Sequence, residues 1–172
     1  YGLQIEKDVK IHQVPFGSEL NKKKNGQANI AQTIEPNVTQ VELGGGKVVF
    51  SYPEAWGPLA LTGVMVSKKM IDNDPLTVQK FVTAYENSLN YIYTNFDGTV
   101  QIAKKYLPDL SEEVIKTALR RLIDSGCIPP HTEINPDSWE KLLQIRIEVG
   151  DLKSMPTKEL FDNTFSNTKY DN

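Results

Sequence analysis

The spacing of apolar residues changes along the chain, from short runs to a helical period at Pro75. Before that point, residues 9–14 alternate apolar and polar side chains, which predicts a short strand. Nearly continuous apolar runs at residues 28–34, 48–50 and 59–67 predict three further strands, of the kind that is buried in a parallel sheet.

Helix signals separate these predicted strands. Ser18 is a suitable N-cap for a short helix over Glu19–Asn25. Glu35-Pro36 opens a second helix, and the glycine run at residues 44–46 ends it. Strand, helix and strand in succession form one βαβ step, so we expect a parallel sheet.

Residues 52–58 contain two prolines, a glycine and two aromatic side chains. This composition argues against a helix and against a central strand. We interpret the segment as a connector between two bodies.

After Pro75 the apolar residues recur at helical spacing. The first two predicted helices are a long one through 78–92 and a shorter one over 100–106. Two more are predicted from their ends, one capped by Ser111 and ended by Gly126, and one capped by Asp137 or Ser138 and ended by Gly150. A last helix is marked by Leu160, Phe161 and Phe165. Each must bury an apolar face, and few strands are available to cover them. We therefore expect part of the fold to be missing.

Composition excludes several function classes. The formal net charge is −3, which gives no electrostatic basis for binding nucleic acid. No apolar run is long enough to span a membrane. His12, His131 and the single cysteine, Cys127, are far apart in sequence, and they suggest no nucleophile–base pair, metal site or cofactor site.

Several segments together resemble a known family. They read NGQANIAQTIEPNV, GGKVVFSYPEAWGP, LTGVMVSKK, TVQKFVTAYENSLNYI and VIKTALRRLI. The pattern is similar to the C-terminal part of ABC-importer solute-binding proteins of the nitrate/sulfonate/taurine and thiamine-pyrimidine-precursor type. It extends over nearly the whole chain.

The resemblance implies an α/β fold of the type II periplasmic binding protein class, with two parallel-sheet lobes flanked by helices and a helix-rich C-terminal half. Residues 1–57 would be the later part of the second lobe, and residues 58–172 the return into the first lobe. The N-terminal half of the family fold would be absent from this chain. The expected partners are that missing half, the ABC permease subunits and a small-molecule ligand. The protein would act outside the cytoplasmic membrane, either in the periplasm or at the extracellular face, where the full-length protein could carry a lipid anchor.

By the same resemblance, the ligand cleft lies at Glu35, Asn37, Tyr52, Trp56 and Thr62. Glu35 would accept hydrogen bonds from a ligand amino group, although an acidic residue at a helix start is also explained by the helix dipole. Tyr52 and Trp56 would stack on a flat ligand or close the hinge against solvent. Asn37 and Thr62 have equally simple structural explanations, as a solvated helix residue and a β-branched strand residue.

The predicted cleft segments 33–37, 51–58 and 60–63 contain no Arg, Lys or His. A bare anion such as nitrate requires charged donors or helix N-termini. We therefore favour a neutral or amino-bearing heterocycle, such as a pyrimidine precursor of thiamine. The alternatives to a non-catalytic binding protein are a pyrimidine-synthase-like enzyme and a sensor domain of the same fold.

Overall fold

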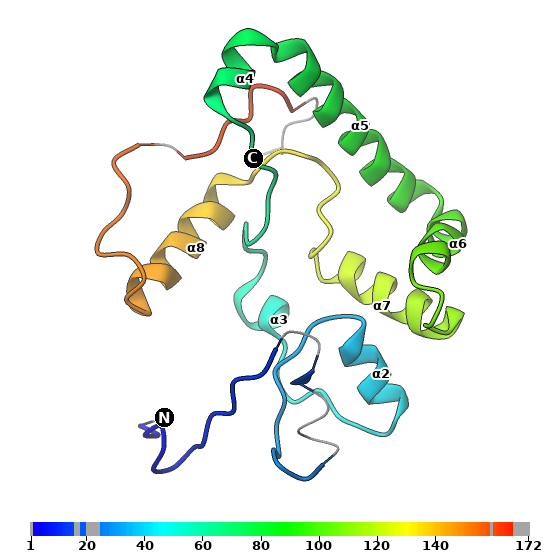
Figure 1. Cartoon of the computed structure of the whole chain (residues 1–172), viewed down its shortest axis with the longest axis vertical. Coiled ribbons are helices and arrows are strands. Elements are labelled where there is room, and N and C mark those ends of the chain that lie inside the picture. The colour runs from blue at the N-terminus through cyan, green and yellow to red at the C-terminus, as the bar shows by residue number, and fades with distance from the viewer. Residues whose placement is uncertain (1, 16–17, 20–24, 159, 167–172) are drawn as a thin grey trace.

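The computed structural model describes residues 2–15, 18–19, 25–158 and 160–166, and within them the chain is built from helices (Figure 1). The helices are α2 (Asn37–Leu43), α3 (Tyr52–Trp56), α4 (Lys68–Asn73), α5 (Pro75–Thr94), α6 (Phe96–Tyr106), α7 (Glu112–Asp124) and α8 (Pro136–Glu148). An isolated bridge joins Ile5 to Val9, and the described residues contain no extended strand.

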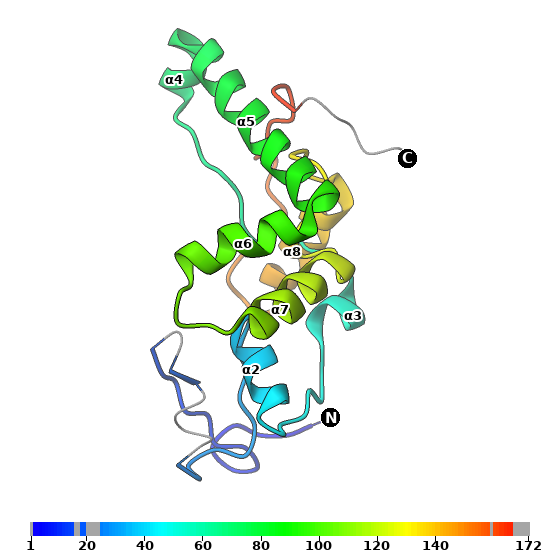
Figure 2. The ribbon, with the colours of Figure 1, turned by 90° about the vertical axis from the view of Figure 1, so that its right-hand side faces the viewer.

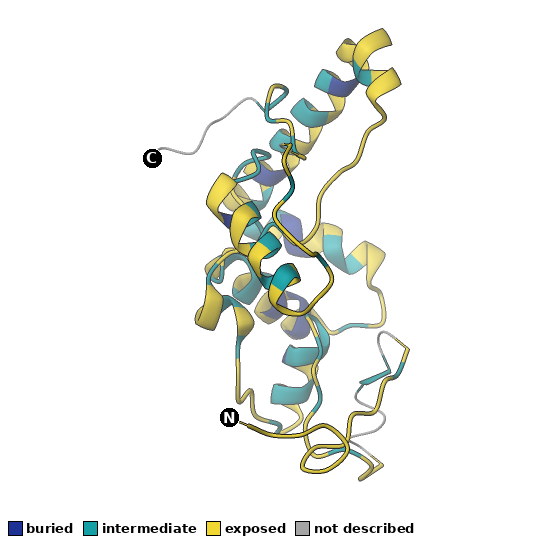
Figure 3. Ribbon diagram, turned by 90° about the vertical axis from the view of Figure 1, so that its left-hand side faces the viewer, coloured by how far each residue is buried: buried dark blue, intermediate teal, exposed yellow. Residues whose placement is uncertain are grey.

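Helices α5, α6 and α7 form the centre of the structure. The long α5 leads into α6, which packs on α7, and α2 lies against the other side of α7 (Figure 2). The buried apolar residues lie on α5, α6 and α7, and buried positions of all kinds are dark blue on the ribbon in Figure 3. The buried apolar residues are Val78, Leu89, Val100, Val114, Ile115 and Ala118. The core is therefore small and almost wholly helical, and α7 is its shared element.

The predicted long helix is confirmed as α5, whose first residue is Pro75. The cap on α7 is also confirmed, because the hydroxyl of Ser111 accepts a hydrogen bond from the amide of Val114 at 3.2 Å. Helix α6 begins at Phe96, four residues before the predicted Val100, because Asn95 caps it through the amide of Gly98 at 3.0 Å. The helical C-terminal half is thus confirmed in its main elements.

The predicted cap of α8 was wrong by two or three residues. Asn135, rather than Asp137 or Ser138, is the N-cap, and its side chain accepts from the amide of Ser138 at 2.9 Å. Pro136 then occupies the first helical position, where its missing N–H carries no penalty.

The predicted last helix does not form in residues 160–166. The side chain of Asn163 instead donates to the carbonyl of Ile134 at 2.8 Å and accepts from its amide at 2.9 Å. Gln79 of α5 donates to the carbonyl of Phe165 at 3.0 Å. These contacts hold residues 160–166 against α5 and against the loop before α8 in a conformation that is not helical. The predicted helix at 19–25 lies largely outside the described residues.

The strands predicted at 9–14, 28–34, 48–50 and 59–67 are not formed as such in the described part of the chain. A strand is stable only beside a hydrogen-bonded neighbour, and no two of these segments pair in a ladder. Their apolar side chains are exposed, for example Ile30 at 76% and Leu61 at 72%. The parallel-sheet lobes of the α/β expectation are therefore not seen in this structure.

The connector at residues 52–58 was predicted not to be helical, and this is wrong. Its first five residues form α3. Ser51 enters in an extended conformation, and Pro53 lies in the first turn, where a proline is compatible with a helix. Gly57 ends the helix with a φ of 72°, a left-handed conformation that favours glycine.

Candidate functional site

Glu35 lies two residues before α2, and a cis peptide bond joins it to Pro36, the N-cap residue of the helix. One carboxylate oxygen accepts a hydrogen bond from the amide of Thr39 at 3.1 Å. The other lies 2.6 Å from a guanidinium nitrogen of Arg121. The Glu35 side chain is only 6% exposed, so both of its oxygens are satisfied within the protein.

Arg121 of α7 joins two carboxylates. Its Nη1 binds Glu35, and its Nη2 binds Glu42 in the last turn of α2. Burial disfavours the charged guanidinium, but hydrogen bonds to Glu42 and Glu35 outweigh burial and raise the pKa of Arg121. The pair of contacts fastens both ends of α2 to α7.

Sequence reasoning missed Arg121, because 86 residues separate it from Glu35. A signal was present in the two acidic residues near the ends of α2, Glu35 before the helix and Glu42 in its last turn. Two nearby acidic residues indicate a cationic partner, but nothing in the sequence selects Arg121 among the other basic residues.

Asn37 makes a local contact. Its amide nitrogen donates to the hydroxyl of Thr33 at 3.3 Å, across the start of α2. Thr62 lies in the exposed extended segment between α3 and α4. Within the described residues, no hydrogen bond connects the Thr62 side chain to the other predicted site residues.

Tyr52 and Trp56 lie together on α3, with their ring centroids 5.0 Å apart. Phe50, which the sequence analysis did not select, packs edge-on against both rings, at 5.1 Å from Tyr52 and 6.4 Å from Trp56. All three rings are partly exposed to solvent. Lys141 of α8 donates to the carbonyl of Trp56 at 2.9 Å and so ties this aromatic cluster (Phe50, Tyr52 and Trp56) to the helical part.

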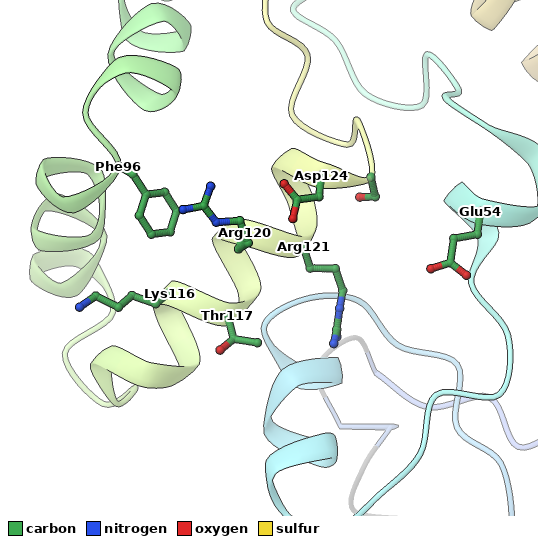
Figure 4. A pocket seen from close by; sticks show the side chains of 8 residues that line it. Glu54, Phe96, Lys116, Thr117, Arg120, Arg121 and Asp124 are labelled. Carbon is green, nitrogen blue, oxygen red and sulfur yellow. The ribbon is translucent and has the colours of Figure 1, made fainter.

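An open pocket of about 580 Å³ lies between α3 and the α6–α7 pair. Figure 4 shows Glu54 facing it from α3, while Arg120 lies over the ring of Phe96 and Arg121 extends toward α2. The guanidinium carbon of Arg120 is 4.1 Å from the Phe96 centroid. The lining residues are Glu54, Phe96, Lys116, Thr117, Arg120, Arg121, Asp124 and Ser125.

This lining changes the expectation about charge. The three predicted cleft segments supply no basic residue, but α7 supplies Lys116, Arg120 and Arg121. Lys116 is paired with Glu112 at 2.7 Å, and Arg121 with Glu35 and Glu42. Within the described part of the chain, Arg120 lies over the Phe96 ring and forms no ion pair. The pocket can therefore offer a hydrogen-bonding cation as well as the carboxylate of Glu54.

Other candidate chemistry is sparse in the described ranges. They contain no group of three or more metal-ligating side chains. Cys127 is exposed, and its sulfur lies 3.3 Å from the hydroxyl of Ser125. His131 is 2.9 Å from Glu86. No described helix has the length and apolar character to cross a membrane.

Comparison with known families gives a match over more than half of the chain. The family model described as NMT1/THI5 like matches residues 2–98, which include the aromatic cluster and all five predicted site residues. Searches of curated proteins and of solved structures found no match. The chain therefore belongs to the NMT1/THI5-like family, the family of nitrate, sulfonate, taurine and thiamine-precursor solute-binding proteins.

Proposed function

We propose that this chain belongs to the extracytoplasmic solute-binding component of an ABC importer. It captures a small organic or oxyanion solute in a cleft between two lobes and delivers it to the permease subunits. The observation that carries this proposal is the family match over residues 2–98. Binding favours the closed form, because the solute contacts both lobes only when they have closed.

The lobes follow the boundaries expected from the sequence, with residues 1–57 in the second lobe and residues 58–172 returning into the first. The N-terminal half of the same protein completes both lobes and the second wall of the cleft. The exposed apolar side chains at 28–34, 48–50 and 59–67 support this arrangement, because such runs are normally buried between helices in a sheet.

The ligand site consists of Glu35, Asn37, Tyr52, Trp56 and Thr62. The rings of Tyr52 and Trp56 bind a flat ligand, and Phe50 supports them from the side. Glu35 accepts from the ligand amino group. An aminated heterocycle of the thiamine-pyrimidine class suits these groups, while the cations of α7 make an oxyanion the second candidate.

Calorimetric titration of the natural full-length protein separates the ligand classes. The compounds are hydroxymethylpyrimidine (the aminopyrimidine unit of thiamine), taurine and nitrate. We expect hydroxymethylpyrimidine to bind, and to bind more weakly when Tyr52 and Trp56 are both replaced by Ala. Replacement of Trp139 by Phe is the control, since Trp139 packs on Phe161 rather than in the aromatic cluster. If nitrate or taurine binds tightly and hydroxymethylpyrimidine does not bind, the proposal of a heterocyclic ligand is rejected.

A catalytic role is the alternative, because the NMT1/THI5-like family includes synthases as well as binding proteins. The two are separated by incubating the bound compound with the protein and recovering it. A binding protein returns the compound unchanged and in the amount supplied, whereas an enzyme converts it or releases additional compound. We propose the former.

A further inference from the structure

Glu35 is not available to a ligand in this conformation. Its Oε1 is 2.6 Å from Nη1 of Arg121, and its Oε2 accepts from the amide of Thr39 at 3.1 Å. With 6% of its side chain exposed, no room is left for a second donor. A ligand amino group reaches this carboxylate only by replacing one of these partners. The Thr39 amide is fixed in α2, so Arg121 is the replaceable one.

The exposure and contacts of Arg121 allow it to release Glu35. About a third of its side chain is exposed, and it lines the open pocket rather than the core (Figure 4). Its second guanidinium nitrogen is bound by Glu42, which is equally exposed. An arginine that releases Glu35 therefore keeps its charge paired with Glu42 and turns toward solvent. The exchange removes one ion pair and leaves the other.

The guanidinium also matches the chemistry of the proposed ligand. It is planar, and it presents N–H donors in one plane to the carboxylate. The amino group of an aminopyrimidine also presents an N–H donor in the plane of its ring, beside a ring nitrogen that accepts, so one of its N–H groups can replace the guanidinium N–H at Oε1 of Glu35. Glu54 and α3, which carries Tyr52 and Trp56, border the pocket from the opposite side. A ligand that enters there meets Arg121 before it meets Glu35.

On this basis we infer that Arg121 is an internal competitor of the ligand for Glu35, and that Glu42 holds Arg121 when the ligand replaces it. This rests on the proposed function, since it assumes that Glu35 contacts the solute. The apparent affinity is then the intrinsic affinity multiplied by the fraction of molecules in which Glu35 is free. Release also removes one of the two contacts that fasten α2 to α7, so ligand binding loosens this junction.

The first test is a titration of the natural full-length protein and its variants with hydroxymethylpyrimidine. Arg121→Met removes the competitor itself, and we expect it to bind hydroxymethylpyrimidine more tightly by at least about twofold. Arg146→Met is the matched control, because Arg146 is paired with Asp151 at 2.7 Å and is not among the residues that line the pocket.

The second test uses the unaltered protein, so it does not depend on a variant that folds. The side-chain nitrogen signals of Arg121 are followed by NMR during titration and identified by their loss in Arg121→Met. We expect them to shift and broaden as Glu35 is released, while those of Arg146, paired with Asp151 at 2.7 Å, stay in place.

The outcomes separate the two proposals. If hydroxymethylpyrimidine binds, but Arg121→Met binds no more tightly and the Arg121 signals do not move, the competitor role is rejected and the binding function stands. If hydroxymethylpyrimidine, taurine and nitrate all fail to bind the unaltered protein, the proposed function is rejected, and the competitor role with it.

Discussion

Arg121 and Glu35 lie 2.6 Å apart across 86 residues of sequence, and they join the segment that leads into α2 to α7. The carboxylate is nearly buried, whereas both partners are exposed in the pairs Lys68–Asp72, Lys116–Glu112 and Arg146–Asp151. Breaking a partly buried pair leaves an uncompensated charge, which is more costly than the loss of an exposed pair.

Arg121→Ala should therefore lower the free energy of unfolding by about 1–3 kcal/mol, because the Glu35 carboxylate loses its charged partner. The measurement is urea unfolding of the natural protein followed by circular dichroism. Arg146→Ala is the matched control, since the pair of Arg146 with Asp151 is exposed and should contribute less than about 1 kcal/mol. Equal losses in the two variants would contradict the special position of Arg121.

The cap of α7 is a second measurable contact. Ser111→Ala removes the acceptor for the amide of Val114 and should reduce stability by about 1 kcal/mol. Ser88→Ala is the control, because Ser88 is exposed within α5 and bonds only to the carbonyl of Ala84 in its own helix. We expect that change to lie within about 0.5 kcal/mol of zero. A larger loss at Ser88 than at Ser111 would contradict the cap assignment.

Local signals explain what the sequence predicted well. Pro75 and Ser111 mark helix starts through interactions within four residues, and both helices begin there. The connector failed because two prolines were counted without regard to position, and Pro53 lies in the first turn of α3, where a helix accepts it. In that case the number of prolines was given more weight than their positions.

Non-local partners explain what the sequence did not predict. Residues 28–34 and 48–50 have strand composition, but a strand also needs a neighbour, and no described segment provides one. The site shows the same limit. Tyr52 and Trp56, four residues apart, were selected and do meet, whereas Arg121 was brought to Glu35 only by the packing of α7 on α2.

The core should be sensitive where it is fully buried. Val100 of α6 is 0% exposed, so Val100→Ala should cost about 1–3 kcal/mol through lost burial and the cavity left behind. Val149→Ala is the control, because Val149 is 65% exposed at the end of α8. Both are measured by urea unfolding. An equal loss at Val149 would contradict the special position of Val100.

The environment of Tyr93 leads us to expect that the stability of the fold decreases at alkaline pH. Its hydroxyl donates to the carbonyl of Ile128 at 2.5 Å, and burial raises the pKa of the phenol above its ordinary value of 10.0. A group whose pKa is raised by folding stabilises the fold fully below its unfolded pKa, and this stabilisation is lost as the pH rises through the folded pKa.

Unfolding measured between about pH 9 and pH 11 should therefore show a loss of stability that Tyr93→Phe reduces. Tyr106→Phe is the control, because Tyr106 is highly exposed and should leave the alkaline slope unchanged. An unchanged slope in Tyr93→Phe would contradict the assignment to Tyr93.

Fluorescence tests the aromatic cluster directly, because the chain contains two tryptophans, Trp56 and Trp139. In Trp139→Phe the emission comes from Trp56, which is partly exposed beside Tyr52, and a flat ligand that stacks there should quench it. In Trp56→Phe the emission comes from Trp139, which packs on Phe161, and hydroxymethylpyrimidine should leave it unchanged. Quenching in Trp56→Phe but not in Trp139→Phe would move the ligand away from α3, and Tyr52 and Trp56 would then act only in closing the connector against solvent.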